Sequence, residues 1–197
     1  MTNQKVNIHT HHPTGTGIEL RAAAIHPWEA KGRHASELLP LPQGTQAMGE
    51  IGLDFACAVP RHEQMRLLCE QLDMAQELHL PVVLHCVRAF EPLMKELSRY
   101  TLRAVIFHGF LGSPEQAQRA VDCGYYLSFG ERTFRSPRTV QALRSTPLDR
   151  LFCETDESLD TIENIYRQIA EAKGVDEDDL SSAILQNYKR IFDDNNR

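Results

Sequence analysis

Short apolar segments alternate with amphipathic segments along the chain, and this alternation limits the folds that the sequence can adopt. Residues 61–79 carry apolar side chains at helical spacing, whereas 82–86 and 104–108 are short and almost entirely apolar. Apolar strands separated by helices are typical of a parallel sheet covered by helices. The seven predicted strands cover residues 6–9, 18–26, 46–53, 82–86, 104–108, 125–129 and 151–154. The sequence therefore predicts an α/β fold.

Length and composition predict one globular domain. The chain has 197 residues and no linker or low-complexity segment, so a single domain over residues 1–197 is expected. No apolar run is long enough to cross a membrane, and the first residues lack the apolar core of a signal peptide. The five cysteines are odd in number and form no CxxC pair, which favours free thiols in a reducing cytoplasm.

The net charge limits how the protein could contact nucleic acid. It is −6 at pH 7, whereas proteins that hold long DNA along their whole surface are usually basic. Any contact with DNA must therefore come from a local basic patch and from bound metal cations.

Residues able to bind metal stand at or near the ends of five predicted strands. They are His9, His11, Glu50, Asp54, His85, His108 and Asp156. Residues i and i+2 of a strand share a face, so His9 and His11 can reach one ion. Functional groups collected at the carboxyl ends of parallel strands are typical of barrel enzymes. The four histidines with two of the carboxylates, Glu50 and Asp156, could hold two divalent ions.

Each residue alone has a simpler interpretation. The His9/His11 pair could be a surface feature, and His85 or His108 could be a hydrogen-bonded structural histidine. Glu50 or Asp156 could cap a following helix. The recurrence of metal-binding residue types at five strand ends favours the metal site.

Five motifs, in the same order, resemble those of the TatD-type metal-dependent hydrolases, a family of amidohydrolase-like barrels. They are His9-Thr10-His11, Gly49-Glu50-Ile51-Gly52-Leu53-Asp54, Pro81-Val82-Val83-Leu84-His85, Ile106-Phe107-His108-Gly109-Phe110 and Glu154-Thr155-Asp156. The similarity covers nearly the whole chain. The resemblance implies a TIM-type (β/α) barrel and hydrolysis of phosphodiester bonds, as in a deoxyribonuclease.

The chain departs from this family in places. The segment between His11 and Ile25 is too short for the helix, strand and helix usual there, and a full barrel typically needs ~250 residues. A shortened or distorted TIM-type barrel of about seven parallel strands, without the second strand-helix unit, is therefore expected. Family residues are also replaced at His12-Pro13, after His85 and at Glu157-Ser158, which alters the surroundings of the substrate.

The resemblance implies a role for each ligand. His9, His11 and Asp156 would hold one ion, His85 and His108 the other, with Glu50 bridging both. Asp156 and Glu50 are the expected catalytic residues, with Asp156 placed to orient the attacking water or to take its proton. Nitrogen-rich ligation suits Zn²⁺ or Mn²⁺, whereas the family is described as using Mg²⁺.

Two further residues have alternative interpretations. Asp54 could fix the tautomer of a ligand histidine, or it could cap a helix or turn. His26 could contact substrate, or it could belong to a structural His-Pro turn.

Three arginines follow the predicted strand 125–129. Arg132, Arg135 and Arg138 could bind substrate phosphates, because guanidinium groups bind phosphate in a bidentate manner. Arg135 matches a family cation, and the alternative is a solvated loop.

Three functions are compatible with the sequence. The first is a two-metal phosphodiesterase acting on DNA. The second is a hydrolase of another bond, such as an amide or a small phosphoester. The third is a metal-binding barrel without turnover. No membrane partner is expected.

Overall fold

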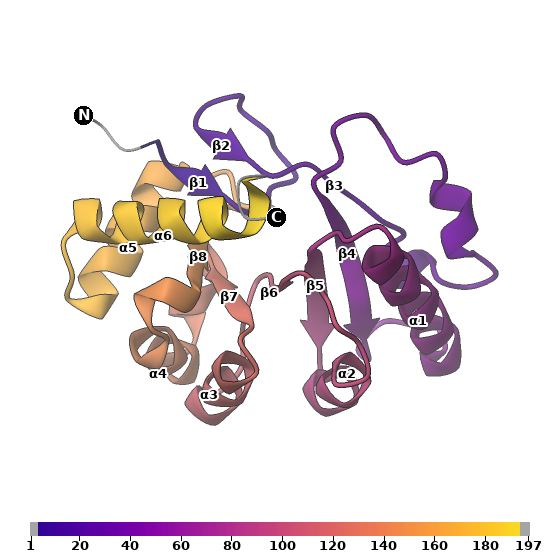
Figure 1. The fold of residues 1–197 in the computed structure, drawn as a ribbon. Coiled ribbons are helices and arrows are strands. Elements are labelled where there is room, and N and C mark those ends of the chain that lie inside the picture. Colours follow the sequence, from indigo (N-terminus) through magenta and orange to yellow (C-terminus); the bar gives the residue numbers. More distant parts are fainter. Residues whose placement is uncertain (1–3, 194–197) are drawn as a thin grey trace. The chain divides into compact units, whose positions relative to one another are not determined.

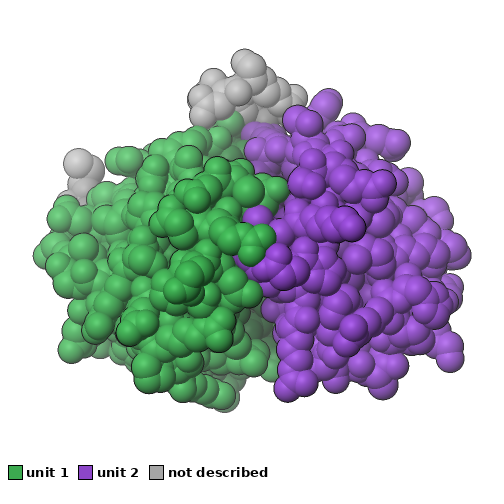
Figure 2. All heavy atoms as spheres, turned by 90° about the horizontal axis from the view of Figure 1, so that it is seen from below, with its two compact units in different colours: residues 1–20, 108–197 green, residues 21–107 purple. Residues whose placement is uncertain are grey.

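The computed structural model describes residues 4–193, which form two compact units. Unit 1 comprises the described residues up to Leu20 and from His108 onward, and unit 2 comprises Arg21–Phe107. Figure 2 colours unit 1 green and unit 2 purple. Within residues 4–193, no helix is both long enough and apolar enough to span a membrane.

Unit 1 contains four short parallel strands. They are β1 (Val6–Asn7), β2 (Ile18–Glu19), β7 (Tyr126–Phe129) and β8 (Leu151–Cys153). β1 pairs with β2, and β7 pairs with β8. Just beyond β1, Thr10 forms a parallel bridge with Asp156, so the chain after β1 runs beside the chain after β8.

Helices surround these strands. They are α3 (Pro114–Asp122), α4 (Pro137–Ser145), α5 (Ile162–Lys173) and α6 (Glu177–Phe192), with short 3₁₀ turns η3 (Glu131–Arg135) and η4 (Leu148–Arg150). Ser113 caps α3, as its position before Pro114 predicts.

Two buried side chains tie the helices of unit 1 to the strands. The hydroxyl of Tyr166 in α5 accepts from the Val6 amide at 3.0 Å and donates to the Val6 carbonyl at 2.9 Å. Asn187 in α6 donates to the carbonyl oxygens of Leu148 and Leu151 at 2.8 and 3.0 Å. In Figure 1, α5 and α6 accordingly lie beside β1 and β8. These contacts position the two segments that carry the histidine pair and Asp156.

Unit 2 is a parallel sheet with helices. Its strands, in order across the sheet, are β3 (Ala22–Ala23), β4 (Ala47–Asp54), β5 (Val82–Val87) and β6 (Val105–Phe107). Its helices are η1 (Pro27–Glu29), η2 (Ala35–Leu38), α1 (Arg61–Glu77) and α2 (Phe90–Leu97). α1 lies along β4 (Figure 1).

Two buried glutamines of α1 hold the chain where unit 2 carries its polar residues. Gln71 accepts from the Ile25 amide at 2.7 Å and donates to the Ile25 carbonyl at 3.1 Å. Gln64 accepts from the Asp54 amide at 2.7 Å and donates to the Asp54 carbonyl at 2.8 Å. Side-chain amides thus replace strand partners at these two points, and they fix the backbone beside His26 and at Asp54.

The predicted parallel α/β arrangement is confirmed, with one difference in detail. The strand expected over residues 18–26 is divided into β2, which pairs with β1, and β3, which pairs with β4. The partner changes at one peptide: the Leu20 amide donates to Asn7, whereas the Arg21 amide donates to the Gln46 side chain. Local apolar character predicts extended chain, but it does not specify the partner strand.

Candidate metal centre

The first group of metal-binding side chains lies in unit 1 and contains His9, His11 and Asp156. The Nε2 atoms of His9 and His11 are 3.3 Å apart, and each lies 3.6 Å from Oδ1 of Asp156. Backbone hydrogen bonds align the two segments: the Asp156 amide donates to the His9 carbonyl, and the His11 amide donates to the Asp156 carbonyl. The expected i, i+2 geometry therefore brings both imidazoles to one carboxylate.

These distances suit a single divalent ion. Ligand atoms at about 2.0–2.1 Å from a tetrahedral zinc ion lie about 3.3 Å from one another. The observed separations of 3.3 and 3.6 Å are close to this value. Two imidazole nitrogens with a carboxylate also leave room for water or substrate, as in catalytic zinc sites.

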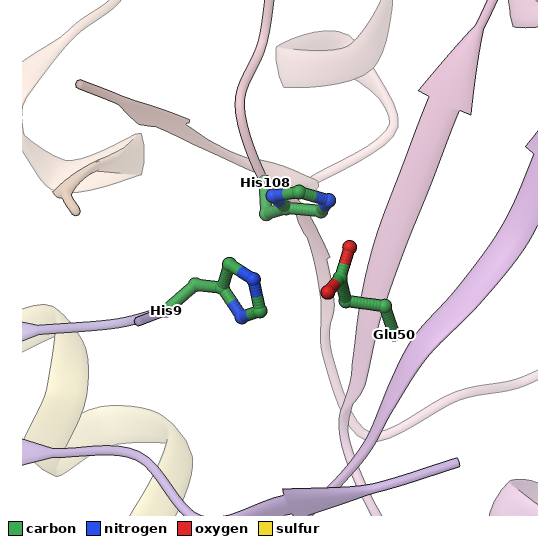
Figure 3. Close-up of side chains that lie close together, drawn as sticks. All are labelled: His9, Glu50 and His108. Carbon is green, nitrogen blue, oxygen red and sulfur yellow. The ribbon is translucent and has the colours of Figure 1, made fainter. Parts of the chain in front are cut away.

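His108 lies beside this group in unit 1. Figure 3 shows the rings of His9 and His108, whose centroids are 4.4 Å apart. On its other side, Nδ1 of His108 is 3.6 Å from Oε1 of Glu154, which also accepts from the Gly109 amide at 2.6 Å. His108, Glu154 and Asp156 themselves form a set of potential metal ligands.

Glu154 is a buried carboxylate, with only 1% of its surface exposed. Burial alone would raise its pKa, but the adjacent imidazoles of His108 and His9 outweigh burial and hold the pKa below its usual value. Glu154 was not among the predicted site residues, although it opens the Glu154-Thr155-Asp156 motif. The signal that could have identified it is this position, directly after an apolar strand.

The second group lies in unit 2 and contains His26, Glu50 and His85. Oε2 of Glu50 is 3.3 Å from Nδ1 of His85 and 3.7 Å from Nε2 of His26. Figure 3 labels Glu50, whose side chain leaves β4. His26 therefore lies against Glu50 in addition to forming the His-Pro turn, where its Nδ1 accepts from the Trp28 amide at 3.2 Å.

Asp54 holds the other side of His85. Its Oδ2 is 3.3 Å from Nε2 of His85 and accepts from Nε1 of Trp28 at 2.6 Å, while Oδ1 accepts from the Ala56 amide at 2.8 Å. Burial would raise the pKa of Asp54, but these donors, together with His85, lower it below the usual value. With Nε2 facing Asp54, Nδ1 is the nitrogen of His85 that faces Glu50.

A cavity of about 440 Å³ in unit 1 reaches Asp156. Arg132 and Arg135 line the cavity together with acidic residues. The guanidinium of Arg135 donates to Glu131 at 3.0 Å, and Ser158 donates to the other oxygen of Glu131 at 2.6 Å. Arg138 is not among the lining residues and instead donates to Gln116 at 3.4 Å. The expected arginine cluster is thus divided, with two members at the cavity.

Comparison with known proteins gives one family. The family model described as TatD related DNase matches residues 19–193. The chain is 32% identical over 168 residues to an uncharacterized metal-dependent hydrolase, YjjV, of Escherichia coli, covering 77% of this chain and 65% of that protein. It is 28% identical over 162 residues to the human deoxyribonuclease TATDN3, covering 74% of this chain and 59% of that one. It therefore spans less than two thirds of these relatives.

Solved structures show the same fold. The crystal structure of YjjV, described as a TatD homolog, superposes with a TM-score of 0.79 at 29% identity, covering 88% of this chain and 76% of that chain. A TatD-family hydrolase from Entamoeba histolytica gives a TM-score of 0.77 at 18% identity, which supports the fold alone. These matches confirm the predicted TIM-type α/β fold class in shortened form.

Proposed function

Because the chain belongs to the TatD-related DNase family, we propose that it is a metal-dependent hydrolase that cleaves phosphodiester bonds in DNA. The observation that carries this proposal is the clustering of imidazole and carboxylate groups in both units: His9, His11 and Asp156 in unit 1, and His26, Glu50 and His85 in unit 2. The proposal treats residues 1–197 as one hydrolase domain. It keeps the expectation of a reducing, cytoplasmic setting, which the free cysteines support.

The proposal includes two divalent ions. His9, His11 and Asp156 would hold one ion and His85 and His108 the other, with Glu50 shared, as the family resemblance implies. The nitrogen-rich donor sets favour Zn²⁺ or Mn²⁺ over Mg²⁺. When bound, such ions polarise a phosphoryl group and lower the pKa of water toward neutrality.

The residues of this chain would share the remaining work. Asp156 accepts the proton of the attacking water at its carboxylate, beside His9 and His11. Glu154 orients the ring of His108, and Asp54 orients the ring of His85. Arg132 and Arg135 line the cavity that reaches Asp156, and they would receive the substrate phosphate there.

A small phosphoester is the second candidate substrate. The observation that favours it is the size of the unit 1 cavity, about 440 Å³, which falls within the range typical of small-molecule sites.

The test begins with protein treated with a chelator and then reconstituted separately with Zn²⁺, Mn²⁺ or Mg²⁺. Metal content, measured by mass spectrometry, should reach two equivalents, and a His9→Ala, His11→Ala variant should lose one of them. Cleavage of single-stranded and duplex DNA and of small phosphoesters should appear only in reconstituted protein. Metal uptake without hydrolysis of any of these substrates would exclude the hydrolase, and absence of uptake would exclude the metal centre.

A further inference from the structure

We infer that Trp28 is a stacking platform for an unpaired nucleobase of the substrate, next to the metal-binding side chains of unit 2. The inference rests on the proposed function and extends it, because it assigns a contact to the base as well as to the phosphate. The ligand class is the terminal or unpaired nucleotide of a single strand.

The indole of Trp28 is held in one orientation. Its Nε1 donates to Oδ2 of Asp54 at 2.6 Å, and its backbone amide donates to Nδ1 of His26 at 3.2 Å. The rings of His26 and His85 stand nearly perpendicular to it, at 80° and 78°, with centroid distances of 4.6 and 6.0 Å. An aromatic ring fixed in this way loses little further conformational entropy when a ligand binds to it.

A large part of this anchored residue nevertheless remains accessible. Trp28 is 55% exposed, whereas Pro27 next to it is buried. The hydrogen bond to Asp54 uses only one edge of the indole, so orienting Asp54 does not require an exposed ring. An anchored, exposed aromatic residue beside the imidazoles of His26 and His85 has the properties of a base-stacking residue.

Stacking also fits the charge of the protein. The net charge of −6 disfavours extended binding through phosphates, so an uncharged stacking contact would add to the limited affinity that a local basic patch and bound cations supply. Every nucleobase has a π-face, and stacking on an indole therefore tolerates any sequence. We accordingly assign affinity for unpaired bases, without sequence preference, to Trp28.

Fluorescence tests this assignment directly, because Trp28 is the single tryptophan of the chain. The metal-loaded protein is titrated with a cleavage-resistant phosphorothioate oligothymidylate and with the same backbone lacking bases at its terminal nucleotides. Binding of both is followed in parallel by anisotropy of a label on the oligonucleotide. Quenching by the base-containing strand alone is expected.

The parallel readouts separate the two proposals. Binding with no change in fluorescence, or with equal quenching by both strands, overturns the stacking role and leaves the hydrolase proposal intact. Absence of binding and of cleavage overturns both.

Variants separate stacking from the hydrogen bond to Asp54. Trp28→Leu removes the ring and the donor, Trp28→Phe keeps a smaller aromatic ring but removes the donor, and Asp54→Asn removes the charge of the acceptor. Trp28→Leu should raise the Kd, measured by anisotropy, for the base-containing strand by about 5- to 100-fold more than for the strand with abasic ends. Trp28→Phe should show a smaller difference between the strands, because its phenyl ring still stacks, and Asp54→Asn should change the Kd for both strands by the same factor. An equal effect of Trp28→Leu on both strands would show that the ring only positions Asp54.

Discussion

The metal-binding groups of the two units are assembled in different ways. In unit 1, His9 and His11 are two residues apart, and backbone hydrogen bonds join them to the segment of Asp156. In unit 2, His26, Glu50 and His85 come from three segments, and side-chain amides of α1 hold two of them, beside His26 and at the end of β4. The first group depends on strand geometry, whereas the second depends on long-range packing.

The two supporting carboxylates, Asp54 and Glu154, differ in the groups that contact them. Asp54 in unit 2 has donors in the Trp28 side chain and the Ala56 amide. Glu154 in unit 1 has the Gly109 amide and the nearby His108 ring. One ligand of unit 1 is more exposed than the histidines of unit 2: the side chain of His11 is 46% exposed, whereas those of His26 and His85 are 22% and 13% exposed. We therefore expect the unit 1 group to carry the chemistry that needs access to water, and the unit 2 group to depend more on an intact fold.

Loss of the Asp156 carboxylate should have the largest effect on activity. Asp156→Asn removes the proposed proton acceptor and one ligand, so kcat on single-stranded DNA should fall by about 10²- to 10⁴-fold. Glu163→Gln, which removes an equal charge from an exposed position in α5, is the matched control. If kcat of Asp156→Asn matches that of the control, the chemistry does not belong to unit 1.

Loss of either supporting carboxylate should weaken metal binding without preventing folding. Glu154→Gln and Asp54→Asn should each raise the Kd of one ion by about 10- to 100-fold. Calorimetric titration with Zn²⁺ separates the two binding steps, and circular dichroism verifies the fold. The same step weakened in both variants would contradict the assignment of one supporting carboxylate to each ion.

Gly52 tests the dependence of the unit 2 group on packing. A Cβ at this position would lie 2.0 Å from the His85 carbonyl oxygen, and the φ of Gly52 is +143°. Gly52→Ala should lower the free energy of unfolding by about 2–5 kcal/mol, because it separates β4 from β5 and strains the backbone. At Gly124 in unit 1, φ is +80° and a Cβ would lie more than 4 Å from every described residue other than its chain neighbours, so Gly124→Ala should cost about 1–2 kcal/mol. If chemical denaturation gives the same loss of unfolding free energy for both variants, the contact between β4 and β5 at Gly52 can adapt to a methyl group.

Acid should remove part of the stability that each supporting carboxylate contributes. Hydrogen bonds and neighbouring imidazoles outweigh burial and keep the pKa of both Asp54 and Glu154 below its usual value. Their contribution is therefore present above the unfolded-state pKa, and it is lost as the pH falls through the folded-state pKa, below about pH 4. Asp54→Asn should be about 1.5–3 kcal/mol less stable than wild type at pH 7, with a smaller difference at pH 3. A difference independent of pH would rule out an ionised Asp54.

The cavity arginine should have the smallest effect. Arg135→Ala should raise KM for DNA a few-fold. It should also reduce the dependence of KM on salt concentration by the amount expected for the loss of about one phosphate contact. The effect is limited because Arg135 is exposed and already pairs with Glu131. Arg138→Ala is the control, because Arg138 does not line the cavity. Equal salt slopes for the two variants would assign both arginines to solubility.

The sequence alone determined the parts of this protein that follow from local geometry. Alternating apolar and amphipathic segments predicted parallel strands and helices, with α1 expected over 61–79 and found at Arg61–Glu77. The spacing of His9 and His11 predicted that their rings share a face, because successive strand residues alternate in direction. The five sequence motifs, in their order along the chain, then identified the TatD-type family.

Tertiary structure alone decided which distant groups meet. Residues 18–26 are divided between two partner strands, since β2 pairs with β1 and β3 pairs with β4. Apolar periodicity does not specify which strand a segment pairs with. The contact of His26 with Glu50, the burial of Glu154 and the anchoring of Trp28 on Asp54 likewise join residues far apart in the chain. Hydrogen bonds and burial depend on which residues lie close together in the folded chain. The periodicity of a sequence indicates only which way each side chain points from its own strand or helix.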